Sequence, residues 1–153
     1  MEIVDARPHD AEAVLAVQRL AFAPAAVRYD DGRLPPFVET AEEIAADIGS
    51  QVVLVAVEDG RILGSVRGAE RDGCVYVGRL IVDPSFQRQG IARRLMLELE
   101  DRFTAAECFE LFTGNMNEPG MGLYSQLGYV ETERRPIKGI LELVYMRKTR
   151  ADA

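Results

Sequence analysis

Two Asp-Gly pairs divide the middle of the chain into three apolar segments, and this pattern limits the fold more than any other feature. The three segments are residues 51–58, 61–69 and 74–82. Asp59-Gly60 separates the first two, and Asp72-Gly73 precedes the third. Asp-Gly between alternating apolar runs is a strong signal for a tight β-hairpin. The pattern therefore predicts three antiparallel strands that are neighbours in one sheet.

The segment after this meander predicts a helix and then a parallel strand. Residues 88–103 carry apolar side chains at every fourth position, which is typical of a helix with one buried face. A further strand is predicted at residues 107–113. Because strands joined by a helix run parallel, residues 74–82 and 107–113 form a parallel pair in an otherwise antiparallel sheet.

The two ends of the chain continue the alternation of strands and helices. The further elements that we expect are a strand at residues 2–6, a helix from Pro8, a loop at 23–37, a helix from Thr40 to Gly49 with a Thr40–Glu43 capping box, a short helix at 118–127 capped by Asn117, and a hairpin of 129–135 and 140–147 that turns at 136–139. The fold class is therefore α/β with a mixed sheet: an antiparallel meander, one parallel β-α-β crossover and a C-terminal hairpin.

The length and charge of the chain restrict its class. Its 153 residues suit one domain, which we expect at residues 1–148 with a short tail at 149–153. A net charge of -7 argues against nucleic acid as a partner. The longest strongly apolar run, Val52 to Val57, is too short to span a bilayer, so no membrane association is expected.

The chain has only two cysteines, Cys74 and Cys108. A disulfide framework would require more of them, and a zinc site would require clustered ligands. We therefore expect a buried thiol at Cys108, no metal, and a reducing, cytoplasmic setting. The start of the chain also lacks the basic and apolar regions of a signal peptide.

The apolar residues of the third meander strand change parity along its length. Val75 and Val77 are odd-numbered, whereas Leu80 and Val82 are even-numbered. Because side chains of a strand alternate between faces, one inserted residue, a β-bulge near residues 78–80, would keep all four on one face. A strand that is buried on both faces needs no bulge, and parity alone leaves both interpretations open.

The helix that follows this strand has an unusual N-terminus. Gly90 in the first turn costs about 1 kcal/mol of helix propensity relative to alanine. Arg88, Arg93 and Arg94 add positive charge at the end where the helix dipole is already positive. This arrangement suits a bound phosphate, because a helix N-terminus offers unpaired N–H groups. The alternative is an accidental glycine in an exposed turn.

Two motifs resemble those of a known family. Residues 80–84 followed by Gln87-Arg88-Gln89-Gly90-Ile91-Ala92 resemble motif A of the GNAT superfamily of acyl-CoA-dependent N-acetyltransferases, whose consensus is Gln/Arg-x-x-Gly-x-Gly/Ala. Asn117 followed by residues 123–129 resembles its motif B. The resemblance implies a GNAT-like fold over nearly the whole chain.

The resemblance also assigns roles to residues. The backbone of the bulged strand pairs with the pantetheine arm of the cofactor, and the loop and helix start hold its pyrophosphate. Asn117 contacts the arm, and Tyr124 donates a proton to the leaving thiolate; the alternative for Tyr124 is a core aromatic. The implied cofactor-binding residues are Leu80, Ile81, Val82, Arg88, Gln89, Gly90, Ile91, Ala92, Arg93 and Asn117.

The sequence departs from the family where a general base is often found. The matching place before motif B is Phe112, and residues 74–82 contain no carboxylate. Glu110, Tyr76 or a chain of waters could serve, so the base stays open. Gly120 stands where alanine is usual in motif B, and we expect little consequence from it.

The function that the resemblance implies is transfer of an acetyl group from acetyl-CoA to a primary amine of a small molecule or peptide, by direct attack in a ternary complex. The acidic balance favours a cationic acceptor, which we expect to enter between Pro35-Pro36-Phe37 and the C-terminal hairpin. The alternative is a catalytically inactive acyl-CoA-binding or regulatory protein. Family members are often dimeric, so a homodimer is one option. The acceptor and the acyl-chain preference stay open.

Overall fold

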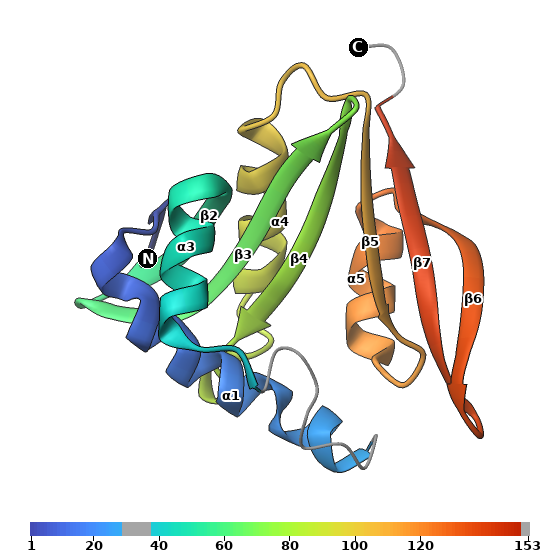
Figure 1. Cartoon of the computed structure of the whole chain (residues 1–153), viewed down its shortest axis with the longest axis horizontal. Coiled ribbons are helices and arrows are strands. Elements are labelled where there is room, and N and C mark those ends of the chain that lie inside the picture. The colour runs from blue at the N-terminus through green and yellow to red at the C-terminus, as the bar shows by residue number, and fades with distance from the viewer. Residues whose placement is uncertain (29–37, 151–153) are drawn as a thin grey trace. The chain divides into compact units, whose positions relative to one another are not determined.

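The computed structural model describes residues 1–28 and 38–150, which form a mixed α/β fold (Figure 1). The strands are β1 (Glu2–Asp5), β2 (Val52–Glu58), β3 (Arg61–Arg71), β4 (Cys74–Val82), β5 (Cys108–Gly114), β6 (Val130–Lys138) and β7 (Leu141–Thr149). The helices are α1 (Ala11–Arg28), α3 (Ala41–Ser50), α4 (Ile91–Asp101) and α5 (Glu118–Gln126), with 3-10 turns η1 (Pro8–Asp10) and η2 (Pro84–Phe86). No helix in these described ranges is both long and apolar enough to cross a membrane.

The strands are hydrogen-bonded in the order β1-β2-β3-β4-β5-β7-β6. β4 and β5 are parallel, whereas β1 with β2, β2 with β3, β5 with β7, and β6 with β7 are antiparallel. This confirms the predicted meander, the single parallel crossover and the C-terminal hairpin.

The chain divides into two compact units. Unit 1 comprises Met1–Gly68 and Arg79–Arg102, and unit 2 comprises Ala69–Gly78 and Phe103–Ala153. β3 and β4 therefore contribute residues to both units. The expectation of one domain over residues 1–148 stays a prediction.

The two predicted hairpin turns are present with the expected backbone. Asp59 and Gly60 have φ values of 52° and 76°, and Asp72 and Gly73 have φ values of 55° and 82°. Two successive left-handed residues are what the tight turn between twisted antiparallel strands requires. The Asp-Gly signal therefore identified both turns correctly.

Unit 1 has a core between its helices and strands, with α3 in front of the strands and α4 behind them in Figure 1. The predicted capping box starts α3: Thr40 Oγ1 accepts from the Glu43 N–H (3.2 Å), and Glu43 Oε1 accepts from the Thr40 N–H (2.9 Å). The buried cluster on the α1–α3 side consists of Ala11, Val14, Val17, Ile44, Val55, Ile62 and Ile81.

Helix α1 is longer than the sequence predicts. We expected a loop from Ala23, but the helix continues through Pro24 to Arg28. Proline removes one backbone donor, and the surrounding alanines, which have the highest helix propensity, favour continuation. The expected entry segment Pro35-Pro36-Phe37 lies outside the described residues.

The C-terminal hairpin also turns later than predicted. β6 includes Pro136, which lies opposite Glu142 of β7, and the strand runs to Lys138 before Gly139. β6 is the last strand in the sheet order, so the missing N–H of a proline need not leave a neighbouring strand unpaired.

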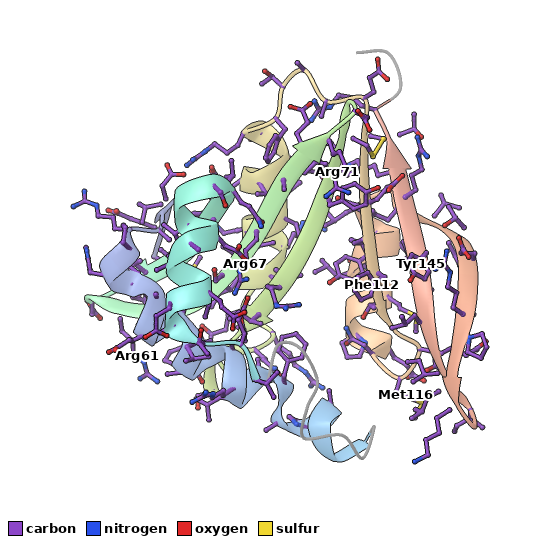
Figure 2. All side chains as sticks on the ribbon, viewed as in Figure 1. Arg61, Arg67, Arg71, Phe112, Met116 and Tyr145 are labelled. Atoms are coloured by element: carbon purple, nitrogen blue, oxygen red, sulfur yellow. A yellow bond between two sulfur atoms is a disulfide. The ribbon has the colours of Figure 1, made fainter. Side chains whose placement is uncertain are left out.

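In unit 2, alternate residues of β5 face a core and an exposed side. Phe109 is fully buried, whereas Phe112 is 59% exposed and contacts Tyr145, its partner on β7, with ring centroids 5.6 Å apart (Figure 2). The other buried residues of this core include Leu111, Leu127, Tyr129, Val144 and Met146.

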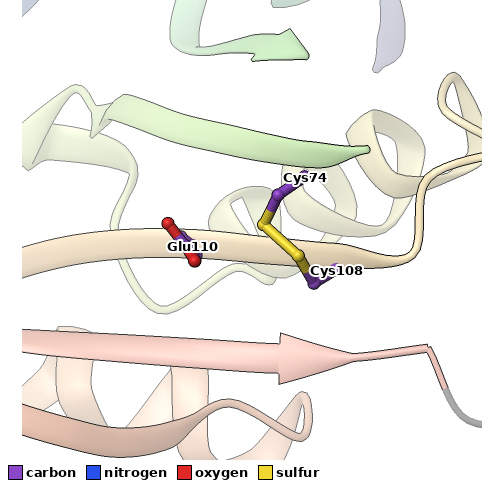
Figure 3. Close-up of side chains that lie close together, drawn as sticks. All are labelled: Cys74, Cys108 and Glu110. Carbon is purple, nitrogen blue, oxygen red and sulfur yellow. A yellow bond between two sulfur atoms is a disulfide. The ribbon is translucent and has the colours of Figure 1, made fainter. Parts of the chain in front are cut away.

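The two cysteines form a disulfide, which corrects our expectation of a buried free thiol. Cys74 and Cys108 lie opposite each other in the parallel β4–β5 ladder, with a Cα–Cα distance of 4.6 Å (Figure 3). They are 34 residues apart in sequence, and only the register of the crossover brings them together. The cysteines therefore no longer support the inference of a reducing compartment.

Gly64 tests the packing of α4 on the sheet. A Cβ at this position would lie 2.6 Å from the Ile81 carbonyl oxygen and 3.2 Å from Leu95. We expect Gly64→Ala to lower the free energy of unfolding by about 1–3 kcal/mol, measured by urea denaturation. Gly78→Ala is the matched strand control, because a Cβ there meets nothing within 4 Å. Equal effects of the two substitutions would contradict this account of the packing.

Candidate functional site

Arg79 breaks the regular geometry of β4 at the place where the sequence predicts a bulge. Its φ is 52°, in the left-handed region that non-glycine residues rarely adopt. Left-handed backbone inside a strand is a conformation that bulges use, which supports the bulge interpretation. Ile81 is the buried residue of the stretch from Gly78 to Val82. β4 ends at Val82, and the chain then enters the loop before α4.

The loop between β4 and α4 is fixed by Asp83, which is 3% exposed. Asp83 Oδ1 accepts from the Ser85 N–H (2.9 Å), and its Oδ2 forms an ion pair with Arg61 (3.0 Å). The Arg61 guanidinium also lies over the Phe86 ring, 5.0 Å from its centroid. These contacts hold the chain where it leaves the sheet and determine how it approaches α4.

Gly90 is the N-cap of α4 rather than a residue of its first turn, which corrects the sequence prediction. The helix begins at Ile91, and Gly90 has φ 80° and ψ 10°. A Cβ there would meet nothing within 4 Å, so the backbone conformation alone requires glycine. Arg88 is also left-handed, with φ 64°.

Two arginines with left-handed backbone conformation lie before and after residues 80–87, the end of β4 and the loop that follows it. The described residues include four non-glycine residues with positive φ, and two of them are the aspartates of the hairpin turns. The other two, Arg79 and Arg88, bracket the stretch that contains Leu80, Ile81 and Val82. Strained backbone of this kind persists where the surrounding structure enforces it, and it clusters at functional sites.

The start of α4 exposes a row of backbone donors. The first hydrogen bond of the helix runs from the Arg94 N–H to the Gly90 carbonyl (3.1 Å). Within the described residues, no protein acceptor meets the N–H groups of residues 88–93. Unpaired N–H groups and the helix dipole give this end a positive potential. The arrangement can bind an anion such as a phosphate.

Three exposed arginines surround the same helix start. Arg88, Arg93 and Arg94 have no ion pair within residues 1–28 and 38–150. Like charges at a positive helix end lower stability unless an anion is present. Of the other predicted site residues here, Ile91 is buried, Ala92 is partly buried and Gln89 is exposed.

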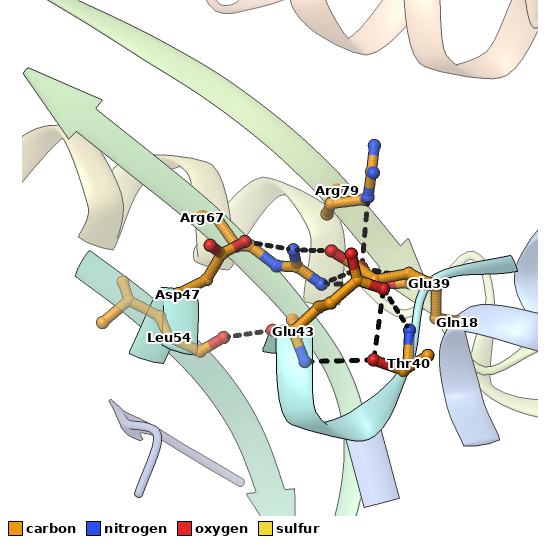
Figure 4. Close-up of polar contacts among 9 residues, drawn as sticks. Gln18, Glu39, Thr40, Glu43, Asp47, Leu54, Arg67 and Arg79 are labelled. Carbon is orange, nitrogen blue, oxygen red and sulfur yellow. Dashed lines mark hydrogen bonds and ion pairs between the residues drawn. The ribbon is translucent and has the colours of Figure 1, made fainter. Parts of the chain in front are cut away.

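A buried polar network in unit 1 was missed by the sequence analysis (Figure 4). Arg67 is 4% exposed, and its guanidinium contacts both oxygens of Glu39 at 2.9 and 3.0 Å. It also contacts Asp47 Oδ2 (2.8 Å) and Gln18 Oε1 (2.9 Å). Arg79 joins through its Nε, 3.5 Å from Glu39 Oε1. A single arginine in an apolar strand gave no periodic signal that would have identified it.

The network shifts the ionisation of its members. Burial alone would raise the pKa of Glu39, but hydrogen bonds from Arg67 and Gln18 and the charges of Arg67 and Arg79 hold it below its ordinary value. Burial lowers the pKa of Arg79, and the charge of Glu39 opposes that shift in part. Glu39 is therefore stabilised as a carboxylate.

In unit 2, Asn117 is the N-cap of α5, as predicted. Its Oδ1 accepts from the Gly120 N–H (3.1 Å), and its Nδ2 donates to Thr113 Oγ1 (2.9 Å). A Cβ at Gly120 would clash with the side-chain amide of Asn117. An alanine at position 120 would therefore require the capping Asn117 side chain to shift, and our expectation that glycine here has little consequence stays a prediction.

Tyr124 lies on α5 in the core of unit 2 and is 8% exposed. Its ring meets the ring of Tyr129 edge-on, with centroids 6.0 Å apart. Burial raises the pKa of Tyr124 to about 12, so the phenol stays protonated at neutral pH. Tyr124 is thus a core aromatic, and it also keeps a hydroxyl proton that it can donate.

Tyr76 and Glu110, the two side-chain candidates for a general base, each contact an arginine. Tyr76 lies directly opposite Glu110 in the β4–β5 register, and its ring is covered by Arg71 at 5.4 Å. Glu110 forms an ion pair with Arg147 (3.2 Å). The Glu110 carboxylate is therefore already engaged by a guanidinium.

Cys74, Cys108 and Glu110 have ligand atoms within 4.8 Å of one another (Figure 3). The two sulfurs are bonded to each other, and Arg147 Nη2 lies 3.4 Å from the Cys108 sulfur. A disulfide and an adjacent guanidinium oppose a cation, so these residues do not fit a metal. The predicted site residues from Leu80 to Arg93 thus lie together in unit 1, whereas Asn117 and Tyr124 lie in unit 2.

Comparison with known proteins identifies relatives. The model of the acetyltransferase (GNAT) family matches residues 14–129. The catalytic subunit NAA20 of the N-terminal acetyltransferase B complex from Arabidopsis thaliana is 34% identical over 74 residues, which are 46% of this chain and 42% of that protein. The UPF0157 protein YqkA of Bacillus subtilis is 29% identical over 89 residues, 58% of this chain and 26% of that protein. The chain therefore spans less than half the length of these curated relatives.

Solved structures share the fold over almost the full chain. The PaiA N-acetyltransferase of Thermoplasma acidophilum, in complex with coenzyme A, has a TM-score of 0.81 and 18% identity, covering 97% of this chain and 98% of that one. The ribosomal-protein-S18-alanine N-acetyltransferase of Escherichia coli has a TM-score of 0.82 and 20% identity, covering 99% and 95%.

The network predicts an acid-sensitive contribution to stability. The pKa of Glu39 is lower in the folded protein than in the unfolded chain, so acidification protonates the unfolded chain first. The contribution is present above the ordinary glutamate value of about 4.3 and is lost as pH falls through the folded pKa. We expect the free energy of unfolding to fall less steeply from about pH 6 to about pH 3 in Glu39→Gln than in the unmodified protein.

Urea titrations at each pH measure this difference. Glu42→Gln is the matched control, since Glu42 is an exposed carboxylate in the first turn of α3. The control should retain the full pH dependence. An equally steep fall in Glu39→Gln and the unmodified protein would show that Glu39 does not carry the effect.

Proposed function

This chain belongs to the acetyltransferase (GNAT) family, whose model matches residues 14–129, and we propose that it transfers an acetyl group from acetyl-CoA to a primary amine of a small molecule or peptide. Acetyl-CoA carries a pyrophosphate, a pantetheine arm and a thioester. Each of these requires a different kind of contact, and the chain offers candidates for all three.

The observation that carries the proposal is the row of N–H groups at residues 88–93, which have no acceptor among the described residues and are flanked by arginines without an ion pair there. In a chain with a net charge of -7, positive side chains gather at the helix end where they repel the dipole. A pyrophosphate relieves that repulsion and accepts hydrogen bonds from the backbone donors. We propose that Arg88, Gln89, Gly90, Ile91, Ala92 and Arg93 hold it.

The pantetheine arm is proposed to follow β4. Its amide groups would pair with the backbone of Leu80, Ile81 and Val82, as an added strand does at a sheet edge. Arg79 ends the regular strand immediately before this stretch. The Thermoplasma neighbour is a complex with coenzyme A, which supports this class of cosubstrate. Asn117 is the proposed further contact to the arm through its remaining Nδ2 hydrogen.

The chemistry requires a neutral amine beside the thioester. The amine nitrogen forms a bond to the carbonyl carbon, the carbon–sulfur bond breaks, and the thiolate leaves. The amine loses one proton, and the thiolate gains one. We propose that Tyr124 hydrogen-bonds the departing sulfur and supplies that proton, since its raised pKa keeps its hydroxyl protonated.

The alternative function is an acyl-CoA-binding protein without transfer. Its support is the absence of a carboxylate from residues 74–82 and the engagement of Glu110, the carboxylate of β5, in an ion pair with Arg147. Binding and turnover separate the two functions. Stabilisation by acetyl-CoA without thiol release on any amine of a panel would favour the alternative.

The first prediction from this proposal concerns binding. Acetyl-CoA at about 100 times its dissociation constant should stabilise the protein by about 2.7 kcal/mol, seen as a rise in melting temperature. The double substitution Arg88→Gln and Arg93→Gln should weaken acetyl-CoA binding about 100-fold or more in calorimetry, because each charged hydrogen bond contributes roughly 1.5 kcal/mol or more and about 1.4 kcal/mol is tenfold.

Arg102→Gln provides the charge-matched control for binding. Arg102 is paired with Asp5 at the other end of α4, so its loss should leave the acetyl-CoA affinity unchanged. No melting shift with acetyl-CoA in the unmodified protein would rule out the proposed function. A shift that survives the double substitution would place the pyrophosphate elsewhere.

The second prediction concerns turnover. Tyr124→Phe removes only the hydroxyl, so the ring contact with Tyr129 is preserved. We expect kcat for thiol release to fall about 10²- to 10⁴-fold, the usual contribution of a general acid, with acetyl-CoA affinity retained. Tyr129→Phe is the control for loss of a tyrosine hydroxyl in the same core. Unchanged turnover in Tyr124→Phe would remove this residue from the mechanism.

A further inference from the structure

Arg79 has hydrogen-bond donors from which none of the described residues accepts. Its Nε is buried and lies 3.5 Å from Glu39 Oε1, close enough for an ion pair but without a hydrogen bond. Across the residues that the structure describes, nothing accepts from its two terminal nitrogens. Figure 4 shows these nitrogens pointing away from Glu39 and the rest of the network. The side chain is 27% exposed, so an incoming molecule can reach it.

The other arginine of the network explains why Arg79 is left open. Arg67 occupies both oxygens of Glu39 and one oxygen of Asp47. Glu39 therefore interacts with two guanidinium groups. Its contact with Arg79 is the longer ion pair through Nε, at 3.5 Å. Burial and the charge of Arg67 both lower the pKa of Arg79. An additional anion near Arg79 would offset both effects.

The backbone fixes where this guanidinium lies. Arg79 is held with φ 52°, in the left-handed region that is unfavourable for a residue with a side chain. A Cβ on the preceding Gly78 would meet nothing within 4 Å, so there is open space beside the break in the strand. Leu80, the next residue, begins the stretch proposed above for the pantetheine arm. The residue that carries these donors is therefore adjacent in the sequence to the stretch proposed for the pantetheine arm.

We propose that Arg79 binds a carboxylate of the acyl acceptor, so that the acceptor is an amine with a carboxylate close to its amino group. This inference rests on the proposed acetyltransferase function and names its acceptor class. The two terminal nitrogens of a guanidinium match the two oxygens of a carboxylate in a planar, bidentate pair. The acceptor class differs from the cationic amines that the overall charge favoured, because a local donor pair determines recognition more directly than net charge.

The test compares matched acceptors that differ only in the carboxylate. Each of the twenty L-amino acids and its carboxamide is assayed with acetyl-CoA for thiol release. We expect at least one amino acid to exceed its carboxamide in kcat/KM by about 10-fold or more. Alanyl-aspartyl amide and alanyl-asparaginyl amide form the second arm, which distinguishes a side-chain carboxylate of a peptide from the α-carboxylate of a free amino acid.

Substitutions at Arg79 link the preference to this residue. In Arg79→Gln the ratio of kcat/KM between acid and amide should fall to about 1, and Arg79→Lys should retain part of it. Arg102→Gln is the control, since Arg102 is 32% exposed, carries the same charge and is paired with Asp5. It should keep the full ratio. Affinity for acetyl-CoA is measured in each variant by calorimetry.

A second measurement reads binding instead of turnover and does not depend on the folding of variants. The N-acetylated amino acid of the preferred acceptor and its amide are titrated into the unmodified protein in the presence of coenzyme A. We expect only the acid to bind measurably at the same concentration. Equal binding of acid and amide would overturn the role of the carboxylate.

The outcomes separate the inference from the function on which it rests. Thiol release with amides as good as with acids, or a ratio that persists in Arg79→Gln, overturns the inference and leaves the acetyltransferase function intact. Weaker acetyl-CoA binding in Arg79→Gln with an unchanged ratio makes Arg79 a cosubstrate contact, which also overturns it. Absence of both acetyl-CoA binding and thiol release rejects the function, and the inference with it.

Discussion

Arg67 lies in β3 almost out of contact with water, where an uncompensated charge costs several kcal/mol. Its guanidinium is compensated by Glu39, Asp47 and Gln18, which come from three separate parts of unit 1. The charge is compensated only when α1, α3 and Glu39 are packed against β3 as in the folded protein. The remaining architecture of unit 1 depends on this requirement, because α1 and α3 are also the helices that cover the core cluster.

The opposite arrangement occurs at the start of α4. There the donors are unpaired, the arginines are exposed, and the backbone at Arg88 and Gly90 is left-handed. We propose that a bound anion compensates these charges. The two arginine-rich regions therefore differ: the charge of Arg67 is compensated within unit 1, whereas Arg88, Arg93 and Arg94 are proposed to be compensated by a ligand.

The sequence predicted what short-range rules determine. The Asp-Gly turns, the Thr40–Glu43 capping box and the Asn117 cap depend on residues within four positions of one another, and all were predicted correctly. The parallel crossover followed from chain connectivity. Contacts between distant residues were not accessible, since nothing near Arg67 in the sequence reveals its partners at positions 18, 39 and 47. The pairing of Cys74 with Cys108 was missed for the same reason.

The disulfide between Cys74 and Cys108 encloses β4, the loop and α4 in a covalent ring. Every residue proposed to hold the pyrophosphate and pantetheine lies inside this ring, except Asn117. A protease that cuts the exposed loop near Gln87 would therefore leave a nicked molecule whose two pieces stay joined until a reductant is added. The exposed loop before α4 is thus tethered on both sides by the same bond.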